Sequence, residues 1–305
     1  MGEFLLKRIL YSGISLVGLI ILVFFLSRLT GNPADLYLPI EASSEARFEF
    51  SQAHGFNDPA LVQFGRFVGD LSRFNLGESL HQHRPVLDMV VEAFPTTLKL
   101  AVLAMTVALI ISIVIGSLAA WRPGSVFDRI ATIISLASAS LPNFWVALVG
   151  VMVFAVALRW LPTSGTGDIF HWILPVVVLF IRPCGLMLQV VRSSMINALS
   201  SAYVKTARAK GVKNRTIIFV HALRNAMLPV ITVAGDQAAG MINGAVIVEM
   251  IFGFPGIGKL MIDSISYRDF AVIQGGVICT AIAIFCLNIV IDLSYALLDP
   301  RIRHN

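Results

Sequence analysis

The sequence predicts an all-α polytopic membrane protein with six transmembrane helices, and two observations carry this prediction. Of the 305 residues, 57% are hydrophobic and only 13% are charged, and one soluble core cannot cover that much apolar surface. The apolar residues are also grouped in runs of roughly twenty or more, the length of helix that crosses about 30 Å of hydrocarbon. The chain therefore belongs in a bilayer.

The six expected spans follow from these runs. They cover Ile9–Leu29, Thr97–Trp121, Ile130–Leu158, Ile173–Val191, Ala226–Ile251 and Val272–Leu298. The first run is too long for a secretory signal peptide and lacks a small-residue cleavage site, so we expect it to be retained as a helix. The chain then divides into a first segment (1–29), an extracytoplasmic segment (30–95), a five-helix core (96–298) and a cytoplasmic tail (299–305).

The distribution of charge predicts the orientation, because Lys and Arg in short loops stay on the cytoplasmic side. The segment 192–225, called the basic loop below, carries seven Lys or Arg residues and no Asp or Glu. In residues 30–95 acidic residues outnumber basic ones. We therefore expect the basic loop and both termini to lie in the cytoplasm. The net charge of +5 needs no nucleic-acid partner, and membrane lipid is the expected surrounding.

Two segments outside the spans have the residues of a site but are better explained otherwise. His81 and His83 could bind a metal, yet two histidines in a polar loop are more often solvated, and we expect no metal. The stretch Gly253–Lys259 resembles a phosphate-binding loop, but Leu260 follows the lysine where Ser or Thr is needed for Mg²⁺. Its glycines and proline favour a tight turn before the sixth span.

The long segment before the second span also contains an expected helix. Leu61, Phe64, Phe67, Val68 and Leu71 have the spacing of an amphipathic helix that lies on the membrane or on a partner.

The basic loop is the most informative segment. Tyr203–Gly211 consists of good helix formers and ends in a glycine that fits a left-handed cap. Small residues at Ala207 and Ala209 permit another surface to approach closely. A solvated loop would account for the charge, but not for a regular helix with a glycine stop.

The block YVKTARAKGVKNRTIIFVHALRNAMLPVIT, residues 203–232, resembles the cytoplasmic EAA loop of binding-protein-dependent transport permeases of the dipeptide, oligopeptide and nickel group. Other motifs of that group occur in the right order: LPNFW at 141–145, FGFPGIGKLMIDSISYRDFAVIQG at 252–275 and LLDPRIR at 297–303. Lys205 replaces the acidic residue of the EAA motif, and Arg224 replaces its first proline.

The resemblance implies a type I ABC importer permease of six helices in the bacterial inner membrane. It would move peptides, or alternatively nickel or another small solute, by alternating access. It further implies a second homologous permease, two cytoplasmic ATPase subunits that bind ATP and Mg²⁺, and an extracytoplasmic solute-binding protein. This chain itself would be no enzyme and hold no cofactor. The positions that the resemblance assigns to ATPase coupling are Lys205, Thr206, Ala207, Arg208, Ala209, Gly211, His221, Leu223, Arg224 and Asn225.

Polar residues within the spans are candidates for a translocation path, because such groups are costly in a bilayer and usually face a bundle interior or a cavity. They are Arg182, Gln189, Asp236, Gln237, Asn243 and Glu249. Pairing of Arg182 with Asp236 or Glu249 would be a purely structural alternative.

Two other classes of protein also need several spans. A stand-alone channel or secondary carrier usually shows internal repeats or paired broken helices, and the sequence has no clear repeat. A membrane-embedded enzyme would need a nucleophile–base or metal constellation, which the predicted spans lack.

Overall fold

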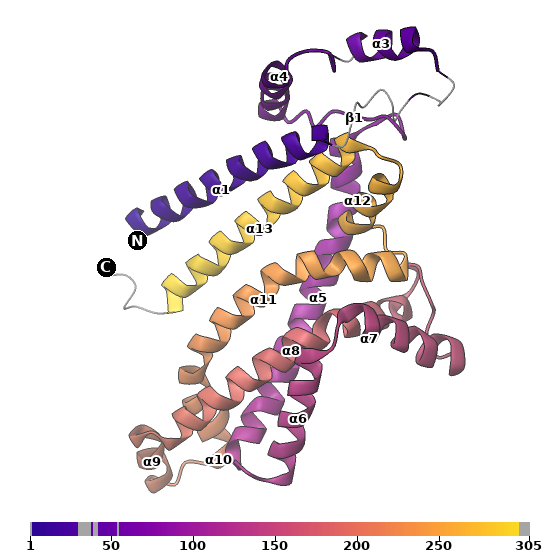
Figure 1. Cartoon of the computed structure of the whole chain (residues 1–305). Helices are drawn as coiled ribbons and strands as arrows, with labels where there is room; N and C mark the ends of the chain where they lie inside the picture. The colour runs from indigo at the N-terminus through magenta and orange to yellow at the C-terminus, as the bar shows by residue number, and fades with distance from the viewer. Residues whose placement is uncertain (1, 30–37, 39–41, 54, 299–305) are drawn as a thin grey trace. The chain divides into compact units, whose positions relative to one another are not determined.

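The computed structural model describes residues 2–29, 38, 42–53 and 55–298, and this part of the chain is mainly helical (Figure 1). Within these residues, five segments are long and apolar enough to cross a membrane, or six if one bent pair counts as a single span. The five include the helices α1 (Gly2–Leu29), α5 (Val86–Trp121), α8 (Ile169–Ser200), α11 (Leu223–Phe252) and α13 (Phe270–Leu298). The all-α polytopic prediction is confirmed. The expected tail, 299–305, lies outside the described residues.

The chain divides into two compact units. Unit 1 contains Thr96–Phe254 and the end of α13 from Cys286, and unit 2 contains Gly2–Pro95 and Pro255–Phe285. Each unit has its own buried apolar cluster.

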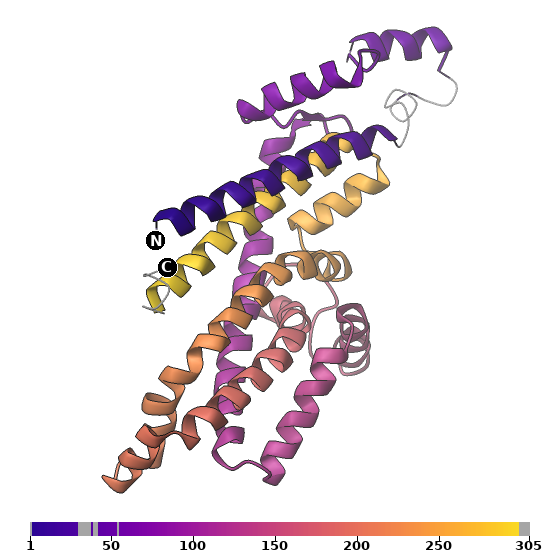
Figure 2. The same ribbon diagram turned by 60° about the vertical axis from the view of Figure 1, so that its left-hand side comes forward.

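Unit 1 is built on α8, which packs against both α11 and α6 (Val126–Ser140). Helices α8 and α11 run side by side in Figure 1 and Figure 2. Gly185 on α8 permits the close approach of α6, because a Cβ atom there would lie 2.5 Å from the carbonyl oxygen of Ser135. Small residues commonly allow such backbone contact between membrane helices.

The third expected span is wrong as a continuous helix. Residues 130–158 instead belong to α6, α7 (Asn143–Gly150) and a π-helix, η1 (Val151–Ala157), with a bend of 104° between α6 and α7. The cause is in the sequence, since Pro142 disfavours helical geometry at the residue before it. Leu141 is accordingly extended, with ψ at 130°. Average hydropathy over the run stays high across this position, so the proline was the signal of the bend in the sequence.

Other expected spans are longer in the structure. Helix α5 begins at Val86 and continues through Pro95, so part of the expected extracytoplasmic segment is continuous with a span. Helix α8 likewise contains Pro175 and Pro183 and runs to Ser200. A buried apolar face on α8 holds it in helical form through both prolines.

The basic loop contains α9 (Ala202–Ala209), α10 (Asn214–Thr216) and a second π-helix, η2 (Ile217–Ala222), which leads directly into α11. The expected short helix ending at Gly211 is confirmed, because Gly211 adopts φ of +74°.

Unit 2 contains α1, α3 (Ser44–Ala53), α4 (Ala60–Ser72) and a short antiparallel pair, β1 (Glu78–Ser79) with β2 (Arg84–Pro85). The expected amphipathic helix is confirmed as α4. Its rings Phe64 and Phe67 contact Phe24 of α1, with ring centroids 5.2 and 5.3 Å apart. Phe64 and Phe67 thus pack on the chain's own first helix, whereas Leu61 of the same helix is 76% exposed.

The glycine-rich stretch before the last span forms a turn, as expected, but a further helix follows it. Gly253 ends α11 with φ of +68°, and α12 (Ile257–Ser266) begins after Gly256. The next helix, α13, is capped by Asp269, whose buried carboxylate also accepts a 2.6 Å hydrogen bond from Ser79. This bond ties the start of α13 to strand β1.

Candidate functional site

Helix α9 is held on unit 1 by its apolar side. Val204 is fully buried and belongs to a cluster with Met195 and Leu199 of α8 and Ile217 of η2. Most of the remaining surface of the helix is exposed, with Lys205, Thr206 and Ala209 directed away from Val204 and the exposed Arg208 on the Val204 side. A short helix is marginal alone, so this packing is what presents a basic, small-residue surface to the outside.

The end of α9 is closed by a Schellman motif. The Val212 amide donates to the Ala207 carbonyl at 3.1 Å, and the Gly211 amide donates to the Arg208 carbonyl at 3.0 Å. This pattern requires the left-handed conformation that Gly211 adopts. Ala207 is half-buried and Val212 packs beside it on the apolar cluster, so both bonds and packing fix the helix end.

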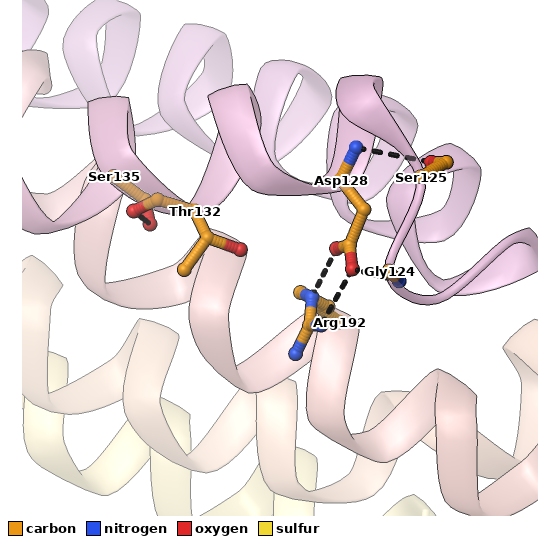
Figure 3. Close-up of polar contacts among 6 residues, drawn as sticks. All are labelled: Gly124, Ser125, Asp128, Thr132, Ser135 and Arg192. Atoms are coloured by element: carbon orange, nitrogen blue, oxygen red, sulfur yellow. Dashed lines mark hydrogen bonds and ion pairs between the residues drawn. The ribbon is translucent and has the colours of Figure 1, made fainter.

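Two cationic contacts connect the basic loop to its surroundings. The Arg208 guanidinium lies 5.1 Å from the ring centroid of Trp121, the last residue of α5. Arg192 of α8 forms a two-pronged ion pair with Asp128 of α6, in which Nη2 lies 2.8 Å from Oδ2 and Nε donates to Oδ1 (Figure 3). The two contacts tie α9 to α5 and α8 to α6.

The Asp128 carboxylate is well satisfied, which explains how it is tolerated at 2% exposure. The Gly124 amide donates to Oδ2 at 2.8 Å, and the Asp128 amide donates to the helix-capping hydroxyl of Ser125 at 3.2 Å (Figure 3). Buried charges persist only when paired and hydrogen-bonded in this way.

Two cavities lie beside the same helices. The first, of about 500 Å³, lies at the α6–α7 bend and is lined by Arg182, Gln237 and Asn243, among others. The second, of about 600 Å³, is lined by Gln189, Arg192 and Thr132, among others. Gln237 of α11 lines both cavities. Pockets of this size accommodate small-molecule ligands.

The remaining expected path residues lie elsewhere. Asp236 is exposed and its carboxylate accepts a 3.1 Å hydrogen bond from Gln237. Glu249 is fully buried and accepts a 2.5 Å bond from the Thr97 hydroxyl, so it faces the core and lines neither cavity. Neither of these hydrogen bonds involves Arg182, so they do not form the ion pair of Arg182 with Asp236 or Glu249 that was the structural alternative.

The other coupling positions are spread along η2 and the start of α11. His221, Arg224 and Asn225 are exposed, whereas Leu223 is half-buried and packs on the apolar cluster. The Asn225 amide donates to the His221 carbonyl at 3.3 Å.

Residues of the histidine loop and of the glycine-rich stretch, Gln82 and Pro255, Gly256 and Lys259, line a third cavity of about 270 Å³. The His81 ring stacks on Tyr267 with centroids 3.9 Å apart. Across the described residues, no three His, Cys, Asp or Glu side chains gather in a metal-binding arrangement. Gly253–Lys259 joins helix α11 to helix α12, whereas a phosphate-binding loop follows a strand.

Comparison with known proteins identifies the family. The family described as "Binding-protein-dependent transport system inner membrane component" matches residues 112–304, which include the basic loop and both cavities. The chain belongs to this family of permeases.

Curated relatives of the permease match it over its whole length. It is 34% identical to the dipeptide transport system permease protein DppB of Alkalihalophilus pseudofirmus and 36% identical to the oligopeptide transport system permease protein AppB of Bacillus subtilis, with all of each chain covered. It is also 35% identical to the glutathione transport system permease protein GsiC of Salmonella paratyphi A, again over both whole chains.

Solved structures support the permease fold. An inward-facing MetNI methionine ABC transporter matches with a TM-score of 0.58 at 14% identity, covering 69% of this chain and 96% of that one. An amino acid ABC transporter crystallised with histidines matches with a TM-score of 0.52 at 19% identity, covering 68% and 94%. The type I importer permease fold is therefore confirmed for this permease.

The sequence did not reveal the Asp128–Arg192 pair, nor that Thr132, Asn143 and Ser193 line the cavities. The partners of the pair are far apart in the chain, and each looked like an ordinary charge near the end of a span. A usable signal was Ser125 three residues before Asp128, which is the pattern of a helix N-terminus.

Proposed function

We propose that this permease is one of two homologous membrane subunits of an ATP-driven importer for peptides. What carries the proposal is full-length similarity to permeases named for dipeptide and oligopeptide transport. The other components would be a second permease, two cytoplasmic ATPase subunits and an extracytoplasmic solute-binding protein. ATP and Mg²⁺ would bind to the ATPase subunits, and this chain would hold no cofactor.

We propose further that the exposed side of α9 docks on an ATPase subunit. Its buried Val204 and the closed helix end fix α9 to unit 1, so a push on α9 can be passed on as a rigid-body motion. The exposed Lys205, Thr206, Arg208 and Ala209 supply positive charge and small side chains that suit an acidic groove. The charge distribution supports a cytoplasmic position for this surface and for both termini.

Purification of the chain from its native operon, with mass spectrometry of what accompanies it, tests the composition. Recovery of a second permease and ATPase subunits, with ATP-dependent peptide uptake in proteoliposomes, is the expected result. Activity of the chain alone without ATP would instead mean a channel or carrier.

The docking surface is tested by adding one negative charge at two exposed positions of the basic loop. Ala209→Glu lies on the exposed side of α9 and should reduce recovery of the ATPase and the coupling of ATP hydrolysis to uptake. Asn214→Glu lies beyond Gly211 and should leave both unchanged. Equal behaviour of the two variants would contradict docking through α9. Ala207→Glu is a weaker test, since Ala207 is half-buried and its substitution also disturbs packing.

A further inference from the structure

The cavity at the α6–α7 bend has an unusual wall. Ser140, Leu141 and Pro142 line it where the chain leaves helical geometry. Within a bilayer, irregular backbone is tolerated only where it is buried in protein or lines a water-containing cavity. The bend therefore marks this hollow as a place that can hold a polar ligand.

The opposite wall keeps the hollow open. Gly240 and Gly244 of α11 line it, and a Cβ atom at Gly240 would meet nothing within 4 Å. Side chains at these positions would occupy the space that the bend creates. The cavity is thus formed by the chain break on one side and by two glycines on the other.

The charged side chain among the described residues that line this cavity is Arg182. Arg182 lines it with the amides of Gln237, Asn143 and Asn243. Among the described residues, no Asp or Glu lines this cavity or the second one, and no carboxylate pairs with Arg182. An exposed guanidinium surrounded by amide groups is suited to a carboxylate, which it can bind with two parallel hydrogen bonds.

The second cavity extends this polar face along α8. Arg182, Leu186, Gln189 and Ser193 are spaced so that they share one face of the helix. Gln237 lines both cavities, and Arg192, which lines the second one, is already paired with Asp128. Arg182 is therefore the cation in these two cavities that has no carboxylate partner within the described chain.

We propose that Arg182 forms a carboxylate-binding subsite on the solute's way through the permease, with Asn143 and Asn243 as supporting donors. This inference rests on the proposed import of peptides, and it names the free C-terminal carboxylate of the peptide as the group that is bound. The subsite favours solutes that carry a free carboxylate independently of any selection by the binding protein.

The test uses the complete transporter in proteoliposomes with two solutes, a dipeptide and the same dipeptide with an amidated C-terminus. Uptake of both solutes is measured for the wild type and for Arg182→Gln. For each protein, the uptake rate of the free dipeptide is divided by that of the amidated dipeptide. The double ratio is the wild-type value of this quotient divided by the value for the variant. Selection by the binding protein cancels in this double ratio. A charge-assisted bond lost from one solute predicts a double ratio of about ten or more.

The control variant is Arg159→Gln, which neutralises an exposed arginine of unit 1 that lines neither cavity, and its double ratio should be one. If Arg182→Gln does not assemble, Arg182→Lys retains the charge without the planar fork and should give a smaller value that still exceeds one. A double ratio of one for an assembled Arg182 variant overturns the subsite. Absence of ATP-dependent dipeptide uptake by the wild type would instead refute the proposed function.

Discussion

The Asp128–Arg192 ion pair predicts an asymmetric response to mutation. The Asp128 side chain is 3% exposed, whereas that of Arg192 is 28% exposed. Removing one member of a buried pair leaves the other charge without compensation, at a cost of about 3–5 kcal/mol. The cost should therefore depend on which member remains.

Arg192→Met leaves the carboxylate buried with only the Gly124 amide as donor, and we expect it to destabilise by about 3 kcal/mol. Asp128→Asn leaves an arginine that can turn toward water, and the new amide oxygen can still accept from Gly124. We expect about 1–2 kcal/mol for this variant. The double variant Asp128→Asn with Arg192→Met removes both charges, and its cost should be smaller than the sum of the single costs.

The assay is unfolding of the purified permease complex in mild detergent, followed for the wild type, the two single variants and the double variant under identical conditions. We expect the wild type to be the most stable and Arg192→Met the least stable, with Asp128→Asn and the double variant between them. An Arg192→Met protein as stable as Asp128→Asn would refute the reasoning from burial. Additive costs in the double variant would refute the direct coupling of the two side chains.

Three further predictions concern the packing around the basic loop and α8. Gly211→Ala should destabilise the end of α9 by about 1 kcal/mol, because Ala disfavours the left-handed conformation. Gly211→Asn should cost less, since Asn tolerates that conformation better. We therefore expect less ATPase to be recovered with the Gly211→Ala complex than with the Gly211→Asn complex. Gly185→Ala should sharply lower the yield of folded permease, since the added carbon would meet a backbone oxygen at 2.5 Å, while Gly240→Ala should not. Trp121→Leu should raise the proteolytic sensitivity of α9, whereas Trp121→Phe keeps an aromatic face for Arg208; equal cleavage of the two would contradict this contact.

Much of the fold was predictable because hydropathy reports directly on burial in a bilayer. Apolar runs located α1, α8, α11 and α13, and the glycine at 211 located the end of α9. The bend at Leu141 was not predicted, although the proline after it carried the signal, because a residue-averaged apolar run hides a single break.

The candidate site was less accessible from the sequence. Arg182, Gln189, Gln237 and Asn243 were singled out as polar residues in apolar helices, and they line the cavities; their place on a translocation path stays a prediction. Glu249 met the same criterion, yet it is satisfied inside the core by Thr97. The residue type indicates that burying a polar group is unfavourable. The fold determines whether that group is solvated in a cavity or hydrogen-bonded to a partner.

The π-helix η2 gives the start of α11 an unusual tolerance of length. A π-helical turn is closed by i→i+5 hydrogen bonds and so contains one residue more than an α-helical turn. Deleting one residue from Ile217–Ala222 would convert this turn to α-helix, and the segments on either side would keep nearly the same direction relative to each other. A deletion inside the α-helical part of α11 would instead rotate everything before it by about 100° relative to the rest of the helix. The same one-residue deletion would therefore preserve the alignment of α9 with the transport helices at one position and destroy it at the other.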